Sequence, residues 1–156
     1  MTGILAGLLA LMGGCNHGVR WEFGRYEDVQ RIGRGEGKLT FVYFRSAFSV
    51  ESTDFEDRVL KDPEVLAETN AMVCVPLEIM WDEPLAHRWQ LTKVPAYAIV
   101  SPDGDVLARR QNPISRDDLL KDMRATRAAL AARERERIAH GPGSPGEPPP
   151  EARNTP

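Results

Sequence analysis

The residues best suited to covalent or metal chemistry are few and widely spaced in this chain of 156 residues. Its cysteines are Cys15 and Cys74, and its histidines are His17, His87 and His140. Two cysteines cannot form a disulfide framework, and the histidines lack the short spacing, such as H-x-x-x-H, that a metal site needs. The sequence therefore predicts no metal and no other cofactor.

Ser49 stands where some hydrolases place a nucleophile, because it follows an apolar segment and precedes a helical pattern. The glycines of a G-x-S-x-G motif are absent around it. Of the histidines, only His87 lies well inside the predicted domain to act as a base. This combination argues against a serine hydrolase.

The overall composition indicates one domain with a packed core. Hydrophobic residues make up 42% of the chain and charged residues 28%, with 20 basic against 23 acidic side chains and a net charge of -3. A nucleic-acid-binding protein would show a basic excess or a basic stripe. Nucleic acid is therefore not an expected partner.

The N-terminal segment 1–14 (MTGILAGLLALMGG) contains no charged side chain. As a helix it would span about 21 Å, which is less than the ~30 Å hydrocarbon core of a bilayer. An apolar run of this kind that ends in small residues favours an export signal, and a buried helix of a cytosolic protein is the alternative.

Residues 12–15 (MGGC) resemble the lipobox of bacterial lipoproteins, in which the cysteine is acylated and becomes the new N-terminus. Leucine is usual where Met12 stands, and a basic residue usually precedes the apolar run. The resemblance implies that Cys15 is the lipidation site and that the protein is exported and held by a lipid anchor on the periplasmic side of the bacterial envelope. A plain cleaved signal or an uncleaved membrane anchor remains open.

The C-terminal segment 141–156 contains half of the chain's 12 prolines, together with glycine and charged residues. It has too few apolar residues to offset the entropy of ordering, so we expect a disordered tail rather than a proline-rich docking ligand. The sequence thus divides into a signal (1–14), a linker with an N-terminal helix (15–37), a domain (38–140) and this tail.

Within the domain, the hydrophobic period alternates between strand and helix. Strands are predicted at 38–44, 71–79, 96–100 and 106–110, and helices at 49–60, 63–68, 84–91 and from 115 onward. Ser49 is a plausible N-cap, and residues 102–105 (PDGD) predict a turn that joins the last two strands as a hairpin. The order predicts an α/β fold, with a mixed sheet of about four strands, helices on both faces and a long C-terminal helix.

The long helix should place its apolar side chains against the core. These are Leu119, Leu120, Met123, Leu130 and Ile138. They become sparse toward the charged run at 133–137, so the contact should weaken in that direction.

Three motifs resemble those of the thioredoxin family. Residues 48–56 (FSVESTDFE) are similar to its W-C-x-x-C-K-x-F-E segment, and 62–65 (DPEV) to the D-P-x-V that follows this helix in periplasmic thiol–disulfide interchange domains. Residues 93–97 (KVPAY) resemble the family's V-P-T-F, whose proline is cis and faces the active-site loop. The resemblance covers residues 38–127 and implies a thioredoxin-like fold.

The redox residues of the family are replaced in this sequence. Ser49 stands at the nucleophile position and Ser52 at the resolving position. Tyr43 replaces the buried aspartate, and Phe48 the tryptophan before the nucleophile. Thiol–disulfide exchange needs a thiolate, which a serine cannot supply. The resemblance therefore implies a redox-inactive relative, with Ser49 and Ser52 as degenerate redox positions and no catalytic residue.

Cys74 is a poor substitute for these cysteines. It lies in the middle of an apolar strand, on the same predicted face as Met72. A reactive thiol needs exposure and nearby positive charge, so we interpret Cys74 as a buried structural residue.

Two functions remain open. In the first, the domain binds an extended peptide or an envelope protein beside Pro95, as strand addition does in the family, with Phe48, Val94 and Tyr97 as an apolar rim and Trp81 as a further candidate. Phe48 and Tyr97 could instead only pack the loop and the sheet. In the second, the chain is a thioredoxin-fold enzyme with an unrecognised active site.

A last cluster follows the second strand. An acidic pair, Asp82 and Glu83, beside Trp81 could hold a cation or an amine, but we expect it to cap the helix that begins at Pro84. His87 and Trp89 on that helix should be surface or packing residues.

Overall fold

The computed structural model describes residues 18–140. The predicted signal, Cys15, His17 and the predicted tail lie outside these residues. The elements are α1 (Tyr26–Glu36), β1 (Thr40–Arg45), α2 (Val50–Arg58), α3 (Pro63–Thr69), β2 (Val73–Glu78), α4 (Glu83–Arg88), β3 (Ala96–Val100), β4 (Val106–Gln111) and α5 (Arg116–His140).

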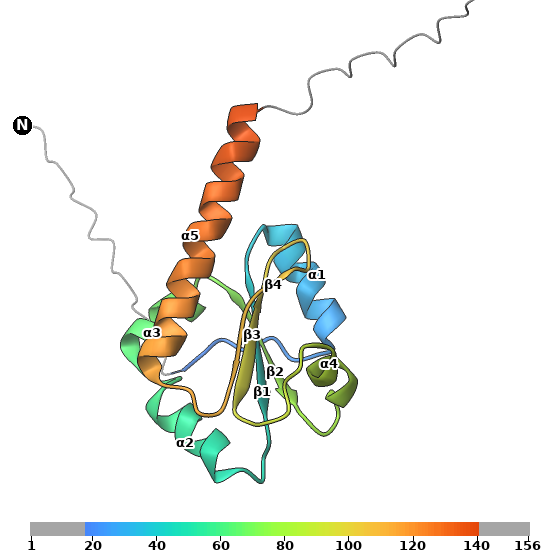
Figure 1. Cartoon of the computed structure of the whole chain (residues 1–156), viewed down its shortest axis with the longest axis vertical. Coiled ribbons are helices and arrows are strands. Elements are labelled where there is room, and N and C mark those ends of the chain that lie inside the picture. Colours follow the sequence, from blue (N-terminus) through green and yellow to red (C-terminus); the bar gives the residue numbers. More distant parts are fainter. Residues whose placement is uncertain (1–17, 141–156) are drawn as a thin grey trace, which may run out of the picture.

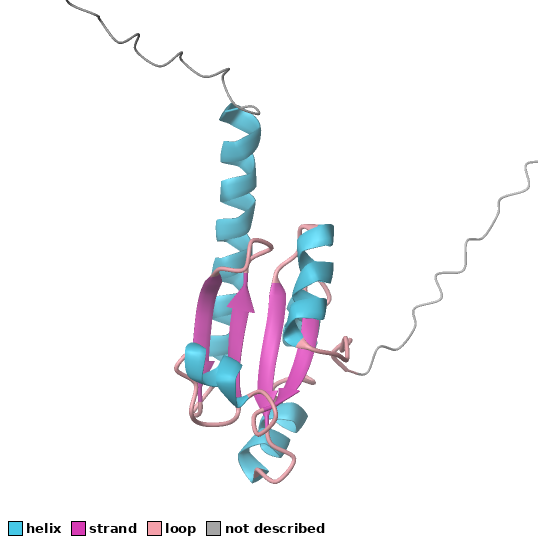
Figure 2. Ribbon diagram, turned by 90° about the vertical axis from the view of Figure 1, so that its right-hand side faces the viewer, coloured by secondary structure: helices cyan, strands magenta, loops and turns pink. Residues whose placement is uncertain are grey.

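The strands form one mixed sheet in the order β2-β1-β3-β4. β1 pairs with β2 in parallel and with β3 antiparallel, and β3 pairs antiparallel with β4. Helices lie on both sides of this sheet (Figure 2). The predicted fold class is therefore confirmed.

β1 is the central parallel strand and is apolar on both faces, as a strand covered on both sides must be. Val42 and Phe44 point into one core layer, while Phe41 and Tyr43 point into the other. The first layer is closed by α1 and α4, and the second by α2, α3 and α5.

α1 lies in segment 15–37, for which the sequence predicted a linker and an N-terminal helix, and it packs as part of the folded unit. Val29 is buried in the first core layer, and the Tyr26 ring meets Trp89 edge-on at 5.1 Å. The preceding segment also joins the sheet, because Trp21 forms a parallel bridge with Cys74 at the open edge of β2.

α5 packs on the second layer as far as Leu130 and not beyond it among the apolar residues of its last turns. Leu119, Leu120 and Met123 are buried and Leu130 packs against them, as predicted. Ile138 is 70% exposed, so the prediction that it faces the core is wrong. The reason is length: α5 has 25 residues against six in β1, and its last turns extend beyond the sheet (Figure 1).

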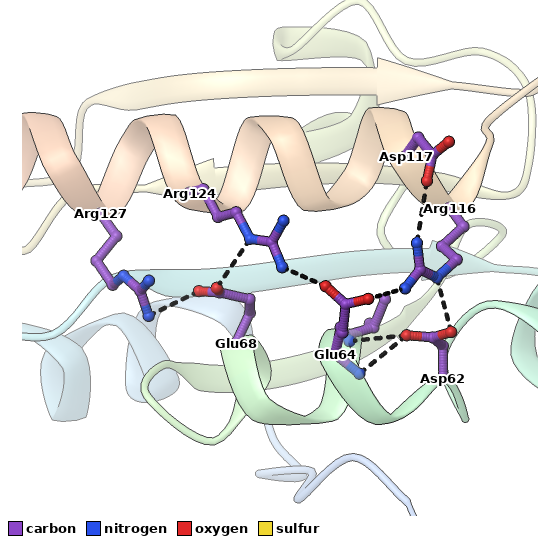
Figure 3. A network of polar contacts seen from close by, with 8 residues as sticks. Asp62, Glu64, Glu68, Arg116, Asp117, Arg124 and Arg127 are labelled. Atoms are coloured by element: carbon purple, nitrogen blue, oxygen red, sulfur yellow. Dashed lines mark hydrogen bonds and ion pairs between the residues drawn. The ribbon is translucent and has the colours of Figure 1, made fainter.

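An ion-pair network joins α3 to α5 (Figure 3). Arg116 contacts Asp62 at 2.7 Å and also contacts Glu64. Arg124 reaches Glu64 at 2.6 Å and Glu68 at 3.3 Å. Arg127 adds a contact to Glu68 at 2.8 Å, so the two helices are linked along three turns of α5.

No helix within residues 18–140 has the length and apolar character needed to cross a bilayer.

Candidate functional site

Four chain segments meet at one edge of the sheet. β1 and β2 are parallel, so their carboxyl ends, Arg45 and Glu78, lie side by side. The first residue of β3, Ala96, pairs with Phe44 of β1 and with Gln111 at the end of β4. The loops after β1, β2 and β4 and the loop before β3 therefore surround a single surface, which we call the carboxyl edge.

Ser49 caps α2 at this edge, as predicted. Its hydroxyl oxygen accepts a hydrogen bond from the Ser52 backbone N–H at 3.1 Å and donates to the Glu51 carboxylate at 2.9 Å. The pKa of Glu51 is lowered by its own backbone N–H and by this hydroxyl. The Ser49 hydroxyl is thus a capping group.

Ser52 faces inward from the first turn of α2. Its residue is 1% exposed, and its hydroxyl oxygen accepts from the Ser46 N–H at 3.3 Å. The side chain therefore ties the loop after β1 to α2. The structure places Ser49 and Ser52 together at the helix start, and both hydroxyls make hydrogen bonds to the backbone of this loop and helix.

A cluster of polar side chains lies next to the first turn of α2. The single hydrogen of the Tyr43 hydroxyl has two acceptors within reach, a Glu56 carboxylate oxygen at 3.3 Å and the Ser52 carbonyl oxygen at 3.4 Å. Arg45 lies 3.2 Å from the same Glu56 carboxylate. Burial, followed by the charge of Glu56, raises the pKa of Tyr43. A tyrosine held neutral in this way is a hydrogen-bond donor to Glu56, not a carboxylate that could accept a proton.

The Val94–Pro95 peptide bond before β3 is cis. The Pro95 carbonyl accepts from the Asn112 N–H at 2.8 Å, and Gln111 accepts from the N–H groups of Thr92 and Lys93 at 2.8 and 3.2 Å. The N–H and C=O of Val94 have no partner among the described residues. Val94 therefore presents backbone groups at the carboxyl edge that can pair with another strand.

Large apolar side chains are exposed around this backbone. Phe48 is 89% exposed in the loop after β1, and Trp81 is 82% exposed in the loop after β2, with Val50 and Met80 also exposed. A hydrogen bond from the Ala47 N–H to the Glu78 carboxylate at 3.1 Å joins the loop after β1 to the last residue of β2.

The prediction that Tyr97 belongs to the apolar rim is wrong. Its side chain is fully buried in the second core layer, and its hydroxyl donates to Asp122 of α5 at 2.7 Å. Alternation along β3 explains this, because Tyr97 sits one residue inside the strand and points beneath α5. Phe48 is exposed, whereas Val94 is half-buried against the first core layer.

Two hollows flank the Val94–Pro95 segment. One, of about 260 Å³, is lined by Glu51, Asp54, Phe55, Val59 and Pro95, among others. The second, of about 390 Å³, includes Met80, Glu83, Leu91 and Thr92. The two hollows thus contain residues from either side of Val94 in the sequence, Leu91 and Thr92 before it and Pro95 after it.

Cys74 is buried, as predicted, and packs in the same layer as Met72. Burial, with a smaller effect of Glu22, raises the pKa of the Cys74 thiol to about 12. A thiol of this kind carries almost no thiolate near neutral pH, so Cys74 is chemically inert.

The cluster after β2 matches its prediction only in part. Asp82 occupies the N-cap position of α4, which begins at Glu83, but its side chain makes no capping hydrogen bond. Burial, followed by the charge of Glu27, raises the pKa of Asp82. Trp89 packs in the core as expected, whereas the exposed His87 lies 3.5 Å from Glu83.

The chemistry available at the carboxyl edge is limited. The described residues include a single cysteine, Cys74, which is buried, and no three of their His, Cys, Asp or Glu side chains lie close enough to hold a metal ion. Exposed aromatic side chains, unpaired backbone and carboxylates remain, and these are the components of a peptide-binding surface.

No protein-family model and no curated protein sequence matches this chain. Solved structures do match. A thioredoxin from Thermus thermophilus has 20% identity and a TM-score of 0.63 over 80% of this chain and 98% of its own. A putative disulphide-isomerase from Bacteroides thetaiotaomicron has 18% identity and a TM-score of 0.61, covering 69% and 92%. A DsbH oxidoreductase has 13% identity and a TM-score of 0.58, covering 81% and 95%. The fold of this chain is therefore thioredoxin-like.

Proposed function

We propose that this chain is a redox-inactive thioredoxin-like module that binds an extended peptide or a partner protein at its carboxyl edge. One observation carries the proposal: the backbone of Val94 has no hydrogen-bond partner among the described residues and lies at the edge where Phe48 and Trp81 are exposed. A strand added there would gain main-chain hydrogen bonds, and its side chains would cover the aromatic rings.

The absence of redox chemistry in this proposal follows from the residues at the helix start. Two of the similar structures are those of a thioredoxin and a putative disulphide-isomerase. In this chain Ser49 and Ser52 occupy the positions that the resemblance assigns to the two redox cysteines, and both hydroxyls hold the local backbone. A serine hydroxyl forms neither a thiolate nor a disulfide.

The module's location is part of the same proposal. The resemblance of residues 12–15 to a lipobox supports export and acylation at Cys15, which would hold the domain at the periplasmic side of a bacterial envelope. Replacement of Cys15 by serine should then release the protein from the membrane fraction and end labelling by a palmitate analogue. Equal labelling of the variant would contradict the anchor.

The binding function is tested by selecting peptides. A phage-displayed library of random peptides about a dozen residues long is panned on the full chain and on its Phe48→Asp variant. We expect enriched peptides that bind the wild type and not Phe48→Asp. The matched control, Ile138→Asp, changes a side chain of similar exposure on the far part of α5 and should bind like the wild type. Enrichment that is equal on Phe48→Asp would overturn the proposal.

An insulin assay addresses the enzyme alternative. The wild-type chain with dithiothreitol should reduce insulin no faster than dithiothreitol alone. Faster reduction by the wild type would show thiol–disulfide activity and contradict the proposal that the module is redox-inactive.

A further inference from the structure

The carboxyl edge is acidic as well as apolar. The carboxylates at this edge are Glu27, Glu51, Asp54, Glu78, Asp82 and Glu83. None of them forms an ion pair with a lysine or arginine of the described chain, and Glu83 contacts His87 instead.

Carboxylates elsewhere on the domain are mostly paired. Asp62, Glu64 and Glu68 meet the arginines of α5, and Asp122 meets Arg110. Similar pairs hold Asp28, Glu36, Asp57, Asp105, Asp117, Asp118 and Glu134. Six carboxylates without a lysine or arginine partner among the described residues therefore lie at the carboxyl edge, on the same side of the domain as the exposed aromatic rings.

We infer that the segment bound at the carboxyl edge is a polypeptide whose apolar residues are flanked by lysine or arginine. The inference rests on the proposed function and names its partner class. Exposed Phe48 and Trp81 offer apolar contact, and the carboxylates on either side of Val94 offer acceptors for cationic side chains.

The positions of the acidic side chains suit an extended partner. Glu51 and Asp54 line the hollow that contains Pro95, together with a single cation, Arg58. Glu83 lines the hollow beside Met80 and Thr92, together with His87. A strand over Val94 runs between these hollows, so basic residues at its two ends would meet a carboxylate on each side.

The cations near this edge do not neutralise it. Arg45 is held by Glu56 at 3.2 Å. Arg58, Arg88 and Lys93 are exposed and form no ion pair in the described chain, but they are outnumbered by the acidic side chains. Burial, followed by the charge of Glu27, raises the pKa of Asp82.

The same peptide selection tests the inference, and the charge of the enriched peptides is the readout. We expect apolar peptides with flanking lysine or arginine, whose affinity falls as salt is raised from low to physiological concentration. Neutralising the edge with Asp54→Asn, Asp82→Asn and Glu83→Gln together should weaken such a peptide about tenfold.

A control variant separates local from general charge effects. Glu22→Gln with Asp103→Asn removes two carboxylates that also lack a basic partner but lie away from the carboxyl edge, and it should leave affinity unchanged.

The failures of the two proposals are distinguishable. Peptides that require Phe48 but carry neutral or acidic flanks, or that ignore the triple neutralisation, would overturn the inference and leave the binding function standing. Peptides that bind Phe48→Asp as well as the wild type would overturn both.

Discussion

The Ser49 hydroxyl accepts a hydrogen bond from the Ser52 N–H at 3.1 Å, and the Ser52 side chain is buried beneath it. The two serines thus form the first turn of α2 and anchor it to the loop after β1 through the Ser46 N–H. In this chain the segment that resembles a redox motif serves as a helix cap. Exposed Phe48 directly precedes this cap, and its backbone N–H donates to the Ser46 hydroxyl at 3.3 Å.

If Ser49 caps α2, the variant Ser49→Ala should have a lower free energy of unfolding than the wild type. Loss of the acceptor leaves the Ser52 N–H without its partner, and the free energy of unfolding should fall by about 1 kcal/mol. Urea denaturation measures this change. Ser49→Thr keeps a hydroxyl that can accept from the Ser52 N–H and donate to Glu51, so it should retain most of the wild-type stability. Equal losses for both variants would contradict the cap.

The double change Ser49→Cys with Ser52→Cys should convert the cap into a redox pair. The two positions are three apart at the start of one helix, which allows a disulfide, and the helix dipole and the residue 52 N–H should lower the pKa of the first thiol. We expect closure under oxidant and slow reduction of insulin, because Tyr43 and Glu51 do not assist proton transfer or thiolate formation. Failure to close would mean that the serines do not lie as described.

The pairing of Glu68 predicts a larger loss of stability. Its side chain is 8% exposed and meets Arg124 and Arg127, so removal of both arginines leaves a buried carboxylate uncompensated. Because the arginines are half-exposed, we expect a loss of about 2–3 kcal/mol for Arg124→Ala with Arg127→Ala, at the low end for a broken buried pair. Adding Glu68→Gln should recover part of it. Arg133→Ala, at an exposed pair, should cost under about 0.5 kcal/mol.

Acid should weaken the same helix contact. Hydrogen bonding to Arg116 lowers the pKa of Asp62, and hydrogen bonding to Arg124 and Arg116 lowers that of Glu64. At about pH 4 these two carboxylates therefore bind more protons in the unfolded chain than in the folded chain. The free energy of unfolding consequently falls as the pH drops toward the lowered pKa values of the folded state. Above about pH 5 this contribution is constant.

Urea denaturation across this pH range measures the effect. The variant Asp62→Asn with Glu64→Gln lacks both titrating groups, so its stability should change less between pH ~5 and ~3. An identical slope in wild type and variant would contradict the assignment.

Local signals in the sequence predicted the elements well. β3 spans Ala96–Val100 as expected, and Gly104 has the positive φ that the hairpin turn requires. Ser49 caps α2, and the Ser115 hydroxyl accepts from the Asp118 N–H at the start of α5. These features depend on neighbouring residues, which a sequence pattern contains.

Features that depend on distant residues were missed. The pairs of Arg116 and Arg124 with Asp62 and Glu64 join positions more than 50 residues apart. Whether Tyr97 lines the rim or packs the sheet was left open by the sequence, because its burial depends on contact with α5, more than 20 residues away. The acidic carboxyl edge was missed as well, because its carboxylates come from loops and helices that are distant in the sequence and adjacent only in the fold.

Binding at the carboxyl edge is tested most directly by two-dimensional NMR of the isotope-labelled full chain during titration with a selected peptide. We predict that amide shifts change first at Val94, Phe48 and Trp81, while the hairpin turn at Gly104 and the far part of α5 stay unchanged. Shift changes confined to the far part of α5 or to the Gly104 turn, with Val94 and Phe48 unaffected, would contradict the account.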